Sequence, residues 1–242
     1  MTSISGKTVL ITGANRGIGR ALVDEALARG AATVYAGTRK PIDHPGPRVR
    51  PVPLDVTSGD QIQAAVETVG SLDLLINNAG IAAYDDLSDP AVIAGHLAVN
   101  LYGTHAVTRA FTPLLARTGG AIVNNLSVNA FAPLPLIASY SISKAAAFSL
   151  TQSLRTLLAP RGIRVHAVLT GIVDTEMSRG VEIPKAAPDV VAAAIFDGVE
   201  NNEDEIFPDP MSQPMADDWR NGAGKALEAR YAALAADVMA AA

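Results

Sequence analysis

Residues 7–19, KTVLITGANRGIG, contain the pattern that decides the fold. The short apolar run Lys7–Ile11 is typical of a strand, and the spacing of apolar residues in Arg20–Arg29 is typical of a helix. Between them, glycines at positions 13, 17 and 19 let the backbone approach a pyrophosphate closely, and a helix N-terminus favours an anion. The stretch therefore predicts a strand, a turn and a helix that bind a dinucleotide. A glycine-rich turn without a ligand is the simpler alternative.

Strand-like and helix-like runs alternate along the rest of the chain. This alternation predicts an α/β fold, a single-domain, Rossmann-like, doubly wound parallel sheet with helices on both faces, over residues 1–242. In such a fold the ligand lies at the carboxyl ends of the strands. The further strands are expected at 33–37, 49–54, 72–76, 121–126, 161–169 and 205–208, and the further helices at 59–69, 89–117, 139–158, 189–200 and 224–241.

Composition and charge exclude several classes of function. The formal net charge is −5 and no basic run is present, so a nucleic-acid surface is not expected. The chain has no cysteine, and its 4 histidines show no ligand spacing, so we expect no metal. The start of the chain does not resemble a signal peptide, and no apolar run approaches the length of a membrane span. These features predict a cytoplasmic protein without membrane contact.

The stretch Leu126–Lys144, LSVNAFAPLPLIASYSISK, contains the side chains that we expect to perform chemistry. If the chain is helical from Ser139 onward, Tyr140 and Lys144 are i,i+4 neighbours, about 40° apart around the axis, and reach the same ligand. An ammonium beside a phenol lowers the phenol pKa from about 10, which makes tyrosine usable as an acid or base at neutral pH. The simpler alternative is a surface tyrosine and a solvated lysine on an ordinary helix.

Several motifs occur in the order found in the short-chain dehydrogenase/reductase family, which this chain resembles over about Lys7–Met177. They are TGxxxGIG at 12–19, NNAG at 77–80, Asn100 within VNLYG, Ser127, and YxxxK at 140–144. The resemblance implies that Ser127 holds a substrate carbonyl and that Tyr140 is the acid/base. It also implies that Lys144 tunes Tyr140 and that Asn100 joins a proton relay through a water. An exposed Asn100 with no role is the alternative.

The resemblance also predicts the cofactor site and favours NADP(H) over NAD(H). An NAD-type site has an Asp or Glu after the second strand, whereas this chain has Thr38 and Arg39, and Arg16 lies inside the glycine turn. Two guanidinium groups are suited to a 2′-phosphate, although both could be solvated surface arginines. The predicted cofactor-binding residues are Gly13, Asn15, Arg16, Gly17, Ile18, Gly19, Thr38, Arg39, Asp55, Val56, Asn78, Ala79, Gly80, Tyr140, Lys144, Gly171, Ile172 and Thr175.

Two positions in this set leave a question open. Asp55 is equally suited to cap the helix that starts near Gly59. Thr170 stands where the family normally has a proline before Gly171, which makes the turn beside the nicotinamide less rigid.

The sequence thus predicts an NADP(H)-dependent oxidoreductase that interconverts a ketone or aldehyde with an alcohol. An apolar substrate is expected, because Phe131–Ile137, Val173 and Met177 supply no cation; a loop that serves only packing is the alternative for 131–137. We expect a short lid at 178–187, an atypical C-terminal segment at 208–242, and a homodimer or homotetramer. The alternatives are a non-catalytic NADP sensor or scaffold, or an epimerase or dehydratase.

Overall fold

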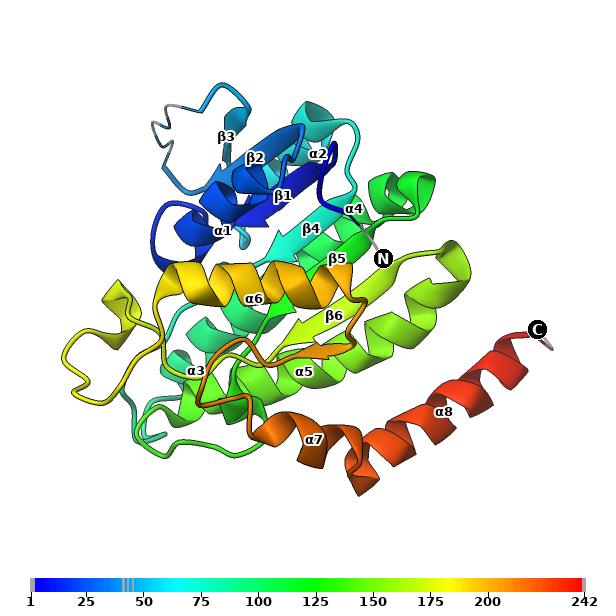
Figure 1. Cartoon of the computed structure of the whole chain (residues 1–242). Coiled ribbons are helices and arrows are strands. Elements are labelled where there is room, and N and C mark those ends of the chain that lie inside the picture. Colours follow the sequence, from blue (N-terminus) through cyan, green and yellow to red (C-terminus); the bar gives the residue numbers. More distant parts are fainter. Residues whose placement is uncertain (1–2, 41, 43, 45, 241–242) are drawn as a thin grey trace.

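A seven-stranded parallel sheet forms the centre of the protein. The computed structural model describes residues 3–40, 42, 44 and 46–240, and the strand order is β3-β2-β1-β4-β5-β6-β7 (Figure 1). The predicted doubly wound fold is confirmed. The strands are β1 Thr8–Thr12, β2 Thr33–Thr38, β3 Val49–Pro53, β4 Leu74–Asn77, β5 Ala121–Asn125, β6 Arg164–Val168 and β7 Glu205–Ile206.

Helices cover both faces of this sheet. Helices α1 (Gly17–Ala28) and α6 (Pro188–Glu200) pack on one face, and α2 (Gly59–Val69), α4 (Thr104–Thr118) and α5 (Ala138–Leu158) pack on the other (Figure 1). Strands that are buried on both faces are apolar along their length. The centre of β1, Val9–Ile11, is accordingly a continuous hydrophobic run.

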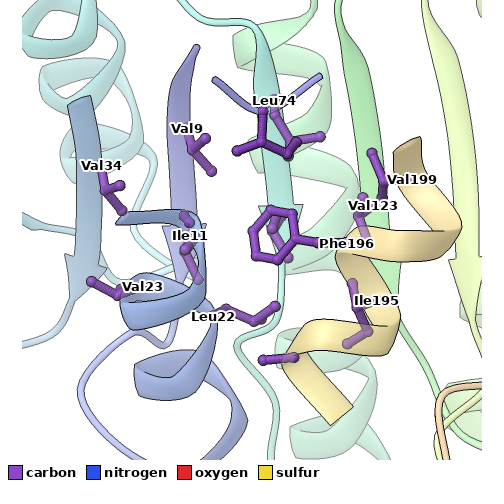
Figure 2. Packing of buried hydrophobic residues seen from close by; sticks show 14 of the residues in the cluster. Val9, Ile11, Leu22, Val23, Val34, Leu74, Val123, Ile195, Phe196 and Val199 are labelled. Carbon is purple, nitrogen blue, oxygen red and sulfur yellow. The ribbon is translucent and has the colours of Figure 1, made fainter. Parts of the chain in front are cut away.

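The core between α1, α6 and the sheet centres on Phe196, which has no exposed surface. Figure 2 shows its ring facing Ile11 of β1 and Leu74 of β4, with Leu22 of α1 nearby. This packing fixes the first turn of α1 above the carboxyl end of β1, which is the place expected for a dinucleotide phosphate.

The helix expected at 89–117 is present as an unbroken helical run over residues 90–118, but its hydrogen-bond pattern changes in the middle. It consists of α3 (Pro90–Leu97), a π-helical segment over Ala98–Gly103, and α4. Asn100 lies inside the π-helical segment and is 2% exposed, so the alternative of an exposed asparagine without contacts is wrong. Short π-helical segments are rare and frequently occur at functional sites.

The third strand and the segment after it differ in detail from the prediction. β3 lies at the edge of the sheet and pairs with β2 alone, so its two prolines, Pro51 and Pro53, are tolerated. The N-cap of α2 is Ser58, whose hydroxyl accepts from the Gln61 N–H, and Asp55 instead accepts from the Thr57 N–H at 2.9 Å. The capping role considered for Asp55 is therefore wrong.

The C-terminal segment forms α7 (Met215–Arg220) and α8 (Ala223–Ala240). The helix predicted at 224–241 is thus confirmed except for residue 241, which lies outside the described residues. Trp219 of α7 stacks on Phe131 with ring centroids 4.8 Å apart, and Phe148 of α5 meets both rings. Within the part of the chain described above, no helix combines the length and the apolar character needed to cross a bilayer.

Candidate active site

The glycine turn between β1 and α1 packs so closely on neighbouring backbone that Gly13 and Gly19 have no space for a side chain. Gly13 has φ of +66°, and a side chain there would place its Cβ 2.9 Å from the Ala79 Cα. A Cβ on Gly19 would collide with the carbonyl oxygen of Gly13. The α1 N-terminus has no side-chain cap and no acidic residue in its first turn, so its N–H groups suit a phosphate. The turn therefore fits the pyrophosphate of a dinucleotide.

The other predicted residues of this turn divide by exposure. Asn15 and Arg16 are exposed, and Ile18 packs against the core. A groove of about 850 Å³ lies on the outer side of the turn and is lined by Arg16, Gly17 and Thr175, among others. Neither Ser127 nor Tyr140 lines it, so the groove is not the candidate catalytic centre.

The predicted catalytic side chains meet at the N-terminal end of α5. The Lys144 ammonium lies 5.6 Å from the centroid of the Tyr140 ring and donates a 2.8 Å hydrogen bond to the Asn125 carbonyl. The Ser127 side chain hydrogen-bonds to Tyr140 and accepts from the Asn129 N–H at 3.1 Å. Lys144 is only 6% exposed, so the alternative of a solvated lysine is wrong.

Burial shifts the pKa of both groups toward their neutral forms. Burial raises the pKa of Tyr140 to about 12, and the hydrogen bond with Ser127 opposes this increase. The expectation that the neighbouring ammonium brings this pKa below 10 is therefore wrong, because burial dominates. Burial lowers the pKa of Lys144 to about 8. At neutral pH the phenol is therefore protonated and the ammonium is still charged, so a neutral acid lies beside a cation.

Asn100 connects three segments around these groups. Its Oδ1 accepts from the Ile81 N–H at 2.9 Å, and its Nδ2 donates to the Ile81 carbonyl and to the Ser143 hydroxyl. The amide side chain is thus engaged by the chain itself. Its main-chain carbonyl accepts from the Thr104 hydroxyl at 3.1 Å.

A row of side-chain hydrogen bonds, which no motif in the sequence predicts, crosses the carboxyl edge of the sheet. The Thr170 hydroxyl donates to Asn125 Oδ1 at 2.8 Å, and Asn125 Nδ2 donates to Asn78 Oδ1 at 2.9 Å. Asn78 Nδ2 in turn donates to the Thr12 carbonyl at 3.0 Å. The row joins the ends of β6, β5, β4 and β1 and runs directly beneath the glycine turn.

The segment after β6 is held at both of its ends. Asp209, 1% exposed, accepts the Gly171 N–H through Oδ2 at 2.7 Å. A Cβ added to Gly17 would lie 3.0 Å from Thr175 Cγ2, which places Thr175 against the glycine turn. Ile172 accepts the Ala186 N–H at 3.1 Å and closes the base of the loop at 178–187.

Asp85 supplies a capping interaction that no adjacent residue provides. The N-cap of α5, Ile137, has no capping side chain, and the Asp85 carboxylate accepts from the Ser139 N–H at 3.1 Å and from the Ser139 hydroxyl at 2.8 Å. A carboxylate at a helix N-terminus is stabilising, and here it positions the turn that presents Tyr140.

The residues expected around the adenosine lie near one another, after β2 and β3. Thr38 is 3% exposed and its hydroxyl donates to the Lys40 carbonyl, whereas Arg39 is exposed. Hydrogen bonds from Thr57 lower the pKa of Asp55, and the positive charge of Arg39 lowers it further. Val56 is buried in the core.

The side chains of the expected apolar wall differ in exposure. Phe131 is partly buried and stacks on Trp219, and Val173 is buried in the core. Leu134, Leu136 and Met177 are exposed.

Comparison with known proteins agrees with this geometry. A family model described as short chain dehydrogenase matches residues 7–185. The chain belongs to the short-chain dehydrogenase family. An oxidoreductase of Staphylococcus epidermidis is 31% identical over 194 residues, which cover 75% of this chain and 84% of that protein.

Two solved structures of this short-chain dehydrogenase's relatives contain bound cofactors. A short chain dehydrogenase from Burkholderia cenocepacia in complex with NADP is 41% identical, with a TM-score of 0.87 over 95% of this chain and 98% of that one. A 3-ketoacyl-(acyl-carrier-protein) reductase from Brucella melitensis complexed with NADH is 27% identical, with a TM-score of 0.75 over 87% and 93% of the two chains.

Proposed function

We propose that this short-chain dehydrogenase is an NADP(H)-dependent oxidoreductase that interconverts a ketone or aldehyde with the corresponding alcohol. The observation that carries the proposal is the position of Tyr140, which hydrogen-bonds to Ser127 and has the Lys144 ammonium 5.6 Å from its ring. A binding protein has no need of a phenol, a hydroxyl and an ammonium in this arrangement.

Each of these groups has a role in carbonyl reduction. A bound nicotinamide supplies or accepts the hydride. The Asn129 N–H occupies one lone pair of the Ser127 oxygen, so the serine O–H can turn from Tyr140 to donate to the oxygen of a bound carbonyl compound. Tyr140 donates the proton to that oxygen, and the Lys144 charge stabilises the phenolate that remains. Asn100, through its carbonyl, supports a water that returns the proton.

The cofactor is held by the chain's own groups at three places. The uncapped N–H groups of α1 bind the pyrophosphate, and Lys144, whose one hydrogen bond among the described residues goes to Asn125, has further donors for the ribose. Arg16 and Arg39 are exposed, and the residues at the end of β2 are Thr38, Arg39 and Lys40, with no Asp or Glu among them. The two arginines therefore bind the 2′-phosphate of NADP(H). The Burkholderia cenocepacia relative in complex with NADP supports this choice.

The substrate is a small apolar carbonyl compound. Leu134 and Leu136 are 45% and 63% exposed on the loop before Tyr140, and Met177 faces solvent at the start of the segment that forms the short lid. These side chains favour an apolar ligand, because a carboxylate would lose its hydration without gaining a cation.

The test compares Tyr140→Phe with Tyr102→Phe, because Tyr102 is 63% exposed and lies outside the catalytic set. Purified protein is mixed with NADPH and a panel of ketones, and the absorbance of reduced nicotinamide is followed. We expect Tyr140→Phe to reduce kcat about 10²–10⁴-fold without weakening NADPH binding in calorimetry, and Tyr102→Phe to match the wild type.

The outcomes separate the alternatives. NADPH binding without turnover of any ketone would indicate a sensor or scaffold, and turnover without net oxidation of NADPH would indicate an epimerase or dehydratase. Retention of more than about a tenth of the wild-type rate in Tyr140→Phe would contradict the acid/base role.

A further inference from the structure

Helix α8 is attached to the rest of the protein by one of its faces. Lys225 donates to the carboxylates of Asp204 and Glu205, both at 3.0 Å, and Glu228 accepts from Gln152 and pairs with Arg155 of α5. These contacts come from the first two turns. Figure 1 shows α8, in red, lying outside the two helical layers beside α5.

The opposite face of α8 carries an exposed apolar row. Leu227, Tyr231, Leu234 and Val238 are 45%, 63%, 61% and 62% exposed. They are separated by four, three and four residues, which is the spacing of the apolar seam in a coiled coil. At 3.6 residues per turn this row points away from the side that Lys225 and Glu228 occupy. Side chains of this size in a contiguous row indicate a contact surface.

We propose that α8 pairs antiparallel with α8 of a second copy of this chain. In that orientation the two apolar rows are self-complementary, with Leu227 opposite Val238 of the second copy and Tyr231 opposite Leu234 of the second copy. A two-fold axis near the middle of α8 generates each contact twice, as isologous interfaces require.

The charges beside the row select the antiparallel orientation. Arg230 and Asp237 flank the row on the same side, both are exposed, and neither forms an ion pair with any described residue of its own chain. Antiparallel pairing brings Arg230 of one copy next to Asp237 of the other, at both ends of the seam. Parallel pairing would place Arg230 beside Ala235, with no opposite charge. Charges in such flanking positions set the orientation of paired helices.

The seam is short, because the eleven helical steps from Leu227 to Val238 span about 16 Å. It is shorter than the heptad runs that form free-standing coiled coils. The ion pairs of Lys225 and Glu228 hold α8 on its own body, which reduces the ordering cost of association. The surface is also separate from the catalytic centre, so the pairing does not depend on the proposed reaction.

The first test measures mass by sedimentation equilibrium over about 1–100 μM protein. The wild type should associate beyond the chain mass of 25.0 kDa. Leu234→Glu places a charge in each half of the seam and should halve the assembly. Ala233→Glu is the matched control, because Ala233 is exposed on α8 but lies off the apolar row, and it should leave the mass unchanged. A monomeric wild type, or a mass that Leu234→Glu does not change, overturns the proposal.

A second test reports the orientation without relying on loss of assembly. Arg230→Glu and Asp237→Arg should each weaken the association about tenfold, and the double variant should restore it. Because the chain has no cysteine, Arg230→Cys mixed with Asp237→Cys should give a disulfide-linked heterodimer, whereas Arg230→Cys alone should not cross-link. Cross-linking of Arg230→Cys with itself, or no restoration in the double variant, overturns the antiparallel arrangement.

Discussion

The Thr170 hydroxyl donates a 2.8 Å hydrogen bond to Asn125 Oδ1, and Asn125 also presents its main-chain carbonyl to Lys144 at 2.8 Å. Asn125 therefore links the turn after β6 to Lys144. Thr170 stands where the family normally has a proline, whose ring would fix the backbone φ angle. In this chain the hydrogen bond from the Thr170 side chain restrains the turn instead.

Thr170→Val should reveal this link, because valine keeps the shape of threonine and removes the hydroxyl. Thr170 is 4% exposed, so Asn125 Oδ1 would lose a buried partner, and the free energy of unfolding should fall by about 1–3 kcal/mol. The KM for the cofactor should rise as well. Urea unfolding and initial rates measure the two effects, with Thr170→Ser as the control that keeps the hydroxyl. Equal stability of the valine and serine variants would contradict the link.

Asp209→Asn should weaken cofactor binding by releasing the Gly171 turn. The two carboxylate oxygens of Asp209 accept from Gly171, Met211 and Ser212, all of which donate. An asparagine NH₂ would face one of these donors, so the segment that leads to the cofactor should become mobile. We expect the Kd for NADPH in calorimetry to rise about tenfold or more. Asp218→Asn, on the exposed side of α7, should leave the Kd unchanged.

The rate of ketone reduction should fall as the pH rises through about 8. Burial lowers the pKa of Lys144 to about 8, so the ammonium is present below that pH and is lost above it. Without its charge the phenolate of Tyr140 is less stable and the proton transfer slows. A pH profile of kcat/KM over roughly pH 6–10 checks this. Lys144→Arg stays charged and should lose the alkaline decline, even at a lower rate.

NADPH should be preferred over NADH by at least about tenfold in kcat/KM, because each arginine contact to the 2′-phosphate contributes about 1.5–3 kcal/mol. Thr38→Asp combined with Arg39→Leu should reverse the preference, since a carboxylate accepts the ribose hydroxyls and repels a 2′-phosphate. Arg50→Leu is the control, because Arg50 is exposed on β3 and was not assigned to the cofactor. Equal kcat/KM for the two reduced cofactors would show that Arg16 and Arg39 do not bind the phosphate.

The strand, turn and helix over residues 7–29, the alternation of strands and helices, and the YxxxK pair were all predictable from the sequence. Each depends on residues close together in the chain, where β-branched runs, helical spacing and glycines act locally. The order of the motifs then sufficed to recognise the family. The i,i+4 relation of Tyr140 and Lys144 needed only a helix, which the structure shows over Ala138–Leu158.

Tertiary structure alone decided which groups hold that site in place. Thr170 and Asn125 are 45 residues apart, Gly171 and Asp209 are 38 apart, and Ser139 and Asp85 are 54 apart. No local pattern marks such pairs, because a threonine, an asparagine or an aspartate is equally suited to a turn or a cap until the sheet brings its partner within hydrogen-bond distance. The π-helical turn at Asn100 has the same origin, since the contacts of its side chain with Ile81 and Ser143 come from other elements of the fold.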